Sequence, residues 1–227
     1  RDHCHATMKF LIASYPRSGN HLVRGLLEFG FRRPTLGPPA LLMRDGPIAD
    51  REPNKAKQAI EIADREPIGL KVHYLRHLLA HQRAFPDATG LLLITRNPGD
   101  AITSQLLRRF TRSPWLGERR LRLAVERDTC DYLGLLYAYK AWSEAARWHL
   151  EFERLVDRTG SLDYANAFLA HVGAPNRLDA AQWDALLQVT KESQSSLGTI
   201  GQRRKPRVRA AIDARLRAED VARILAG

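Results

Sequence analysis

A short turn near the start of the chain holds residue types suited to binding an anion. The stretch YPRSGN, residues 15–20, follows the apolar run Phe10–Ser14 and precedes a helical pattern. Its glycine lets the backbone approach an oxyanion, the first N–H groups of a helix point at such a ligand, and Arg17 adds forked, charged donors. Ser18 and Asn20 add side-chain donors. The pattern predicts a phosphate-type site, although a plain strand-to-helix turn would use the same proline and glycine.

A second turn repeats this arrangement further along the chain. The stretch RNPGDAITS, residues 96–104, follows the apolar run TGLLLIT. Arg96 ends the predicted strand and Ser104 lies eight residues later on the predicted helix, so a guanidinium and a hydroxyl can bind one anion by charge-assisted hydrogen bonds. The alternative for Arg96 is a strand-end side chain that only reaches solvent. Asp100 falls in the first helical turn, where its charge suits the helix dipole, and we interpret it as structural.

The elements that position these turns alternate between short apolar strands and longer amphipathic helices. Such alternation predicts βαβ units, hence an α/β fold with a parallel sheet covered by helices on both faces. In such folds ligands bind at the carboxyl ends of the strands, where both turns fall. We predict strands at 10–14, 68–72, 89–96 and, more weakly, 150–156, a loop at 33–50, and helices at 19–29, 52–65, 75–84, 99–110, 121–128, 133–150, 162–171, 180–191 and 208–225.

Length and composition limit the other possibilities. The 227 residues suit one domain, expected over residues 8–227, with residues 1–7 as a leader. There is no apolar run of membrane-spanning length and no secretory signal pattern, and two cysteines give no disulfide framework, so we expect a cytoplasmic protein. His3-Cys4-His5 has no partner at ligand spacing, and no metal site is expected. The net charge of +11 favours anionic ligands without choosing among them.

With both turns in view, the chain resembles the sulfotransferases that use 3′-phosphoadenosine 5′-phosphosulfate (PAPS). Residues 15–20 are similar to that family's 5′-phosphosulfate loop, Y-P-K-S-G-T-T, and residues 96–104 to its 3′-phosphate motif, R-N-P-x-D-x-x-x-S. Residues 70–75, LKVHYL, resemble the K-T-H-L-P segment that carries the catalytic histidine. Residues 150–157 resemble R-Y-E-D-L, and residues 197–202 resemble R-K-G-x-x-G. Two anion motifs in the family's order and at its interval are more specific than either motif alone.

The resemblance implies a three-layer α/β/α, P-loop nucleotide-hydrolase-like fold and in-line transfer of a sulfuryl group to a hydroxyl or amine. It implies that His73 is the general base, that Arg17 stabilises the leaving phosphate and that Lys71 assists. The alternative for His73 is a side chain that packs or caps the strand end. Adenosine 3′,5′-bisphosphate would be the product. The implied donor-binding residues are Arg17, Ser18, Gly19, Asn20, His21, Arg96, Ser104, Gly198, Arg203 and Arg204.

Two departures from the family pattern bear on these roles. Arg17 stands where the family has lysine, and a guanidinium stabilises charge without readily giving up a proton. Ser196-Leu197 stands at the late Arg-Lys position, so Arg203 or Arg204 is the candidate substitute.

Two other functions compete with the sulfotransferase interpretation. They are a nucleotide-dependent kinase, although G-x-x-x-x-G-K-[ST] is absent, and a non-catalytic binder of polyanions. The acceptor class stays open between small molecules, glycans and lipids. We expect no nucleic-acid partner, and the sequence does not indicate an oligomeric state.

Overall fold

A parallel five-stranded sheet forms the centre of the computed structural model, which describes residues 9–36, 67–84, 90–110, 117–157, 159–192 and 199–226. The strand order is β2-β3-β1-β4-β5, and every pairing is parallel. Strands β1, β3 and β4 are buried along their whole length, as expected of a sheet covered on both faces. The strands are β1 (Phe10–Ser14), β2 (Thr35–Leu36), β3 (Gly69–Val72), β4 (Gly90–Thr95) and β5 (Arg147–Glu151).

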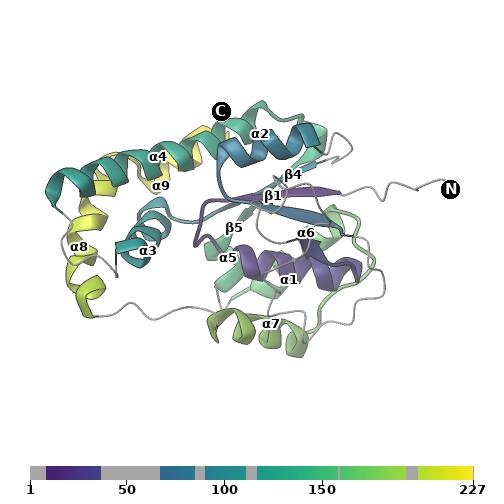
Figure 1. Ribbon diagram of the computed structural model, residues 1–227. Coiled ribbons are helices and arrows are strands. Elements are labelled where there is room, and N and C mark those ends of the chain that lie inside the picture. Colours follow the sequence, from purple (N-terminus) through teal and green to yellow (C-terminus); the bar gives the residue numbers. More distant parts are fainter. Residues whose placement is uncertain are drawn as a thin grey trace.

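Helices cover both faces of the sheet (Figure 1), which confirms the predicted three-layer α/β/α arrangement. Alternate residues of β1 divide between two hydrophobic clusters, Phe10 and Ile12 on one side and Leu11 and Ala13 on the other. The first face is covered by α1 (Asn20–Phe31), α5 (Phe152–Val156), α6 (Ser161–His171) and α7 (Ala180–Glu192). The second is covered by α2 (Leu75–Ala84), α3 (Pro98–Phe110), α4 (Glu118–Ala141), α8 (Thr199–Asp213) and α9 (Ala218–Ala226).

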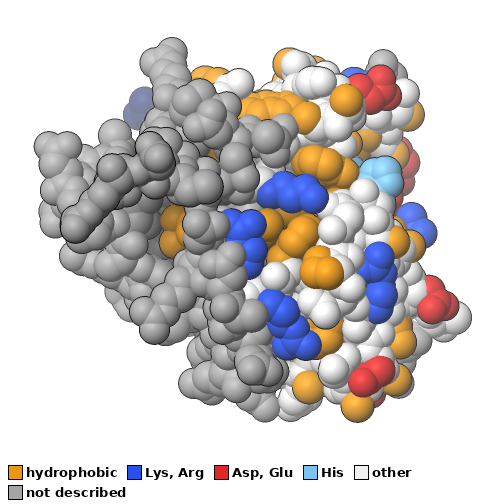
Figure 2. All heavy atoms as spheres, turned by 90° about the vertical axis from the view of Figure 1, so that its right-hand side faces the viewer, with side chains coloured by type: hydrophobic (Ala, Val, Ile, Leu, Met, Phe, Trp, Pro, Cys, Tyr) orange, Lys and Arg blue, Asp and Glu red, His pale blue; other side chains and the backbone are white. Residues whose placement is uncertain are grey.

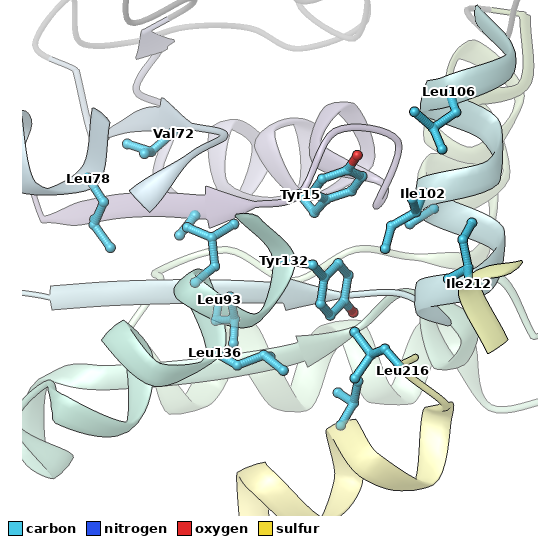
Figure 3. Close-up of a cluster of buried hydrophobic side chains, with 14 of the residues drawn as sticks. Tyr15, Val72, Leu78, Leu93, Ile102, Leu106, Tyr132, Leu136, Ile212 and Leu216 are labelled. Atoms are coloured by element: carbon cyan, nitrogen blue, oxygen red, sulfur yellow. The ribbon is translucent and has the colours of Figure 1, made fainter. Parts of the chain in front are cut away.

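The cluster on the second face extends to the carboxyl ends of the strands. Figure 3 shows side chains of β3 and β4 packed with α4, while α3 and the segment after α8 close the far end. Tyr15 and Tyr132 lie at that end, next to the turns predicted to bind anions. The surface at the other end of the sheet, where the strands begin, carries Lys and Arg side chains interspersed with apolar ones (Figure 2). The positive charge is therefore not confined to the end that holds the two turns.

Two helices predicted in the second half of the chain are wrong in their bounds. The helices expected at 121–128 and 133–150 are one helix, α4, which ends at residue 141. No proline or glycine interrupts residues 129–132, so the helix continues through them. The segment beyond it becomes a 3₁₀ turn and then β5, because Trp148 packs edge-on against Phe10 and fills the space beside Gly90.

The elements near the chain's end differ in the same way. The strand expected at 150–156 is β5, which starts earlier and stops at residue 151, and residues 152–156 form α5. The single helix expected at 208–225 is two helices, α8 and α9, with a break at residues 214–217. At that break the Asp220 carboxylate accepts a hydrogen bond from the Arg217 N–H at 3.0 Å, which starts a new helix. The helix expected at 52–65 lies outside the described residues.

Candidate functional site

The first turn has a backbone shaped to bind an anion. The Ser18 N–H donates to the Tyr15 carbonyl at 3.2 Å, and Arg17 between them has a positive φ of 73°. With proline before it, this is the pattern of a type II β-turn, in which glycine or asparagine usually takes the position of Arg17. Gly19 follows with φ of 83° and precedes α1. Left-handed residues between ordinary ones gather N–H groups into a concave anion site, which the helix N-terminus extends.

Gly19 is required by space as well as by its backbone angle. A Cβ atom at this position would lie 2.1 Å from the ring of Phe152. The same ring lies 4.9 Å from the Arg96 guanidinium, so Phe152 contacts both predicted turns. Phe152 begins α5, at the carboxyl end of β5, and belongs to the segment matched to R-Y-E-D-L.

The two turns are joined by direct hydrogen bonds. The Arg96 Nη1 donates to the Arg17 carbonyl at 2.8 Å, and the Arg17 Nε donates to the Ser104 Oγ at 3.3 Å. Residues that are 79 and 87 positions apart in the sequence therefore meet at one edge of the sheet. The structure brings together both turns that the sequence predicted, on the same side.

A third arginine adds to the positive charge of this edge. Burial lowers the pKa of the Arg17 guanidinium, and the charges of Arg108 and Arg96 lower it further. Sequence reasoning missed Arg108, although it follows Ser104 by four residues and so lies on the same face of α3. Three guanidinium groups close enough to repel one another are suited to a ligand with more than one negative charge.

The polar atoms of the first turn fit such a ligand unevenly. Ser18 is fully buried, and its Oγ has no hydrogen-bond partner among the described residues, so a ligand oxygen there would satisfy it. The Asn20 side chain instead turns inward, where its Nδ2 donates to the Ser14 Oγ at 3.0 Å. What Asn20 can offer an anion is its backbone N–H. His21 lies in the first turn of α1. Together with the guanidinium cluster, Ser18 makes these residues fit a polyanionic donor.

His73 is held in one tautomer at the end of β3. Its Nδ1 lies 2.9 Å from the Ser14 carbonyl oxygen, which can only accept, so Nδ1 carries the proton and Nε2 keeps the lone pair. Burial lowers the pKa of His73 to about 3, and the nearby charges of Lys71, His21 and Arg24 add to this. The imidazole is therefore neutral at physiological pH and able to accept a proton at Nε2. Lys71 lies two residues earlier on β3 and is 5% exposed. Of these three charges, that of Lys71 lowers the pKa of His73 the most.

The second turn is supported by groups from two other elements, α5 and α8. The Glu153 carboxylate accepts a hydrogen bond from the Asn97 N–H at 2.7 Å. Arg209 of α8 donates to the Asn97 Oδ1 at 2.9 Å and pairs with both Asp100 and Asp213. Asp100 is thus structural, as predicted.

Some predicted site residues cannot be placed in this way. Gly198 lies outside the described residues, and of Arg203 and Arg204 only the backbone, on α8, is described. A cavity of about 450 Å³ lies instead along β5, and it contains none of the predicted site residues. It is lined by Tyr139, Arg147, Trp148, His149, Leu150, Tyr164, Ala167, Phe168 and His171.

The described ranges hold neither a metal-binding cluster nor a membrane-spanning helix. No group of three His, Cys, Asp or Glu side chains in those ranges is arranged to hold a metal ion. None of the helices described is both long and apolar enough to cross a membrane.

Comparisons with known proteins identify the fold. No protein-family model and no curated protein matches the chain. Among solved structures, mouse sulfotransferase SULT7A1, complexed with PAP, is similar with a TM-score of 0.50 and 18% identity, covering 84% of this chain and 67% of the mouse chain. Sulfotransferase STF9 from Mycobacterium avium has a TM-score of 0.51 and 15% identity, covering 97% of this chain and 76% of its own. The chain has the sulfotransferase fold. This confirms the P-loop-like α/β architecture implied by the motifs.

The buried histidines of this sulfotransferase fold predict acid sensitivity. Burial lowers the pKa of His73 to about 3 and that of His149, whose Nε2 lies 2.7 Å from the Thr95 Oγ1, to about 4. In the unfolded chain both regain the ordinary value of 6.5. Between pH 6.5 and about pH 4 the unfolded state therefore binds more protons, and each histidine lowers the free energy of unfolding by about 1.4 kcal/mol per pH unit.

Urea unfolding of the wild type and of His149→Gln at pH 7 and pH 5 measures this contribution. The variant lacks one of the imidazoles that take up a proton on unfolding. Its free energy of unfolding should therefore fall less between the two pH values than that of the wild type. An equal fall in both proteins would contradict the burial of a neutral His149.

Proposed function

We propose that this protein transfers a sulfuryl group from PAPS to a hydroxyl or amine of an acceptor. The observation that supports this most is the contact between the two anion-binding turns. The Arg96 guanidinium donates a hydrogen bond to the Arg17 carbonyl, and the Arg17 guanidinium donates one to the Ser104 hydroxyl. A donor with anionic groups at its 5′ and 3′ positions presents one to each turn. A neutral histidine, His73, ends the neighbouring strand β3.

The donor-binding roles follow from where each residue lies. We assign the 5′-phosphosulfate to the first turn, with Arg17, Ser18 and the N–H groups of residues 19–21, which include Gly19, Asn20 and His21. We assign the 3′-phosphate to Arg96 and Ser104, which share the second turn and its helix. Gly198 remains a proposed contact from the motif match, and Arg203 or Arg204 remains the proposed substitute for the late Arg-Lys pair of the family.

The chemistry resembles phosphoryl transfer, so the protein must supply positive charge at the bridging oxygen and hold the reacting atoms in line. His73 Nε2 takes the proton of the acceptor hydroxyl as its oxygen forms a bond to sulfur. The bond between sulfur and the bridging oxygen breaks, and adenosine 3′,5′-bisphosphate leaves with the electron pair. Arg17 stabilises the charge on this leaving phosphate, and Lys71 adds positive charge from β3.

The low pKa of His73 is compatible with this role. Lys71 is among the charges that lower it, and a bound polyanion would offset them. Negative charge nearby favours the imidazolium, so the pKa of His73 rises towards the working pH when the donor is bound. The cationic groups of the protein also meet the charge requirement that Mg²⁺ meets in kinases.

A thermal-shift experiment separates the proposed function from its two alternatives. At about one hundred times its Kd, adenosine 3′,5′-bisphosphate should raise the Tm by about 5 to 10 °C, since binding adds about 2.7 kcal/mol to stability. ATP with Mg²⁺ should raise it less. A larger shift with ATP and Mg²⁺ would favour a kinase, and a shift with a sulfated polysaccharide alone would favour a polyanion binder.

His73→Ala tests the proposed general base. We expect turnover to fall by about 10² to 10⁴-fold, because the variant lacks the proton acceptor. Binding of adenosine 3′,5′-bisphosphate, measured by calorimetry, should persist. Transfer of labelled sulfuryl groups to compounds of a metabolite extract reports turnover, and His171→Ala, in the cavity beside β5, is the control. Near-normal turnover by His73→Ala would remove this residue from the mechanism.

Arg96→Ala tests the assignment of the 3′-phosphate. Losing a hydrogen bond to a charged group costs about 1.5 to 3 kcal/mol, so affinity for adenosine 3′,5′-bisphosphate should fall by about ten- to 150-fold. Affinity for adenosine 5′-phosphosulfate, which has no 3′-phosphate, should fall less, because that nucleotide loses only the support that Arg96 gives to the backbone of Arg17. Arg122→Ala, an exposed residue of α4, serves as the control. Equal losses for both nucleotides would show that Arg96 does not bind the 3′-phosphate.

A further inference from the structure

Helix α4 contacts both anion-binding turns through two residues one helical turn apart. The Tyr15 hydroxyl, at the start of the first turn, donates to the Asp128 Oδ2 at 2.8 Å. The Tyr132 hydroxyl donates to the Arg96 carbonyl at 2.6 Å and lies 3.4 Å from the Arg96 N–H. Asp128 and Tyr132 are four residues apart and so lie on one face of α4.

These contacts are deeply buried. Asp128 is fully buried, and Tyr15 and Tyr132 are 1% and 2% exposed. The centres of the two rings lie 5.6 Å apart. Figure 3 shows the two tyrosines next to each other. Burial raises the pKa of both tyrosine hydroxyls, so each remains a protonated donor at physiological pH. Hydrogen bonds sheltered from water in this way hold their geometry more tightly than exposed ones.

The Asp128 carboxylate is itself held in place by two arginines. The Arg109 Nη1 lies 3.1 and 3.2 Å from its two oxygens, and Arg127 donates to its Oδ1 from Nε and Nη2 at 3.1 and 3.0 Å. Arg109 belongs to α3, the helix that starts at the second turn. The carboxylate therefore connects α4, α3 and the first turn.

Together the contacts close a ring. From α4 they pass through Asp128 to Tyr15, along the chain to Arg17, across to Arg96 and back through Tyr132 to α4. A straight helix fixes its two contact points about 6 Å apart along its axis. The ring thus ties the separation of the two turns to a rigid element.

We propose that Asp128 and Tyr132 are positioning residues that set the separation of the two turns and so make the site specific for a donor phosphorylated at both the 5′ and 3′ positions. This inference rests on the proposed function, because it assigns one phosphate to each turn. Tyr132 acts through the backbone of Arg96, and Asp128 acts through Tyr15. Neither residue needs to touch the donor.

Two conservative variants each release one of the two turns, and so affect binding at opposite ends of the donor. Tyr132→Phe keeps the packed ring and releases only the Arg96 backbone, so affinity for adenosine 3′,5′-bisphosphate should fall by about tenfold, the effect of losing one buried hydrogen bond. Affinity for adenosine 5′-phosphosulfate should change less than twofold. Tyr15→Phe releases the first turn, which both nucleotides occupy, so it should weaken both by similar factors. Tyr139→Phe, also on α4 but beside the β5 cavity, is the matched control.

Calorimetric titration of each variant with both nucleotides gives the ratio of its affinities for adenosine 3′,5′-bisphosphate and adenosine 5′-phosphosulfate, which decides the question. If α4 only stabilised the fold, Tyr132→Phe would lower the affinities for the two nucleotides equally. That result would overturn the inference. A change below twofold in the affinity for adenosine 3′,5′-bisphosphate would overturn it as well. If Tyr132→Phe does not fold, Tyr15→Phe decides, with unchanged affinities overturning it. A wild-type protein that does not bind adenosine 3′,5′-bisphosphate would instead overturn the proposed function, and the inference with it.

Discussion

The arrangement of the site depends on one hydrogen bond, from the guanidinium of Arg96 to the backbone carbonyl of Arg17. It joins the ends of β1 and β4, and it holds Arg17 in a left-handed conformation that a non-glycine residue seldom adopts. Arg17 can then direct its own guanidinium to Ser104 on the second turn. The bond thus converts two separate strand-to-helix turns into a single cationic surface.

Assembling that cationic surface costs free energy, because it brings like charges together, and contacts from several elements hold it in place. Burial lowers the pKa of the Arg17 guanidinium, and the like charges of Arg108 and Arg96 lower it further. Phe152 packs against Gly19 and the Arg96 guanidinium, Glu153 orders the backbone of Asn97, and Arg209 ties α8 to the start of α3. Repulsion among partly buried arginines at this edge of the sheet is relieved when a ligand of the opposite charge binds there, so the site is suited to an anion.

The sequence predicted the features that depend on neighbouring residues. Each turn, with the strand before it and the helix after it, is one continuous stretch, and the apolar strands indicated a sheet covered on both faces. The lack of proline and glycine at residues 129–132 could have joined the two predicted helices into α4. The end of α4 and the position of β5 were not predictable, because Trp148 joins a strand only through its packing on Phe10 and Gly90. The same holds for Asp128 and Tyr132, whose roles arise from contacts with residues distant in the chain, whereas Arg108 could have been found from its place four residues after Ser104. The tautomer of His73 likewise depends on a carbonyl of another strand.

The central claim is that one nucleotide bridges the two turns, and a crystal structure of the complex with adenosine 3′,5′-bisphosphate tests it most directly. The account predicts the 5′-phosphate against the Ser18 hydroxyl and the N–H groups of residues 19–21, and the 3′-phosphate within hydrogen-bonding distance of Arg96 and Ser104. His73 should face the open side of the 5′-phosphate. A nucleotide bound in the cavity along β5, or bound with its two phosphates exchanged between the turns, would contradict it.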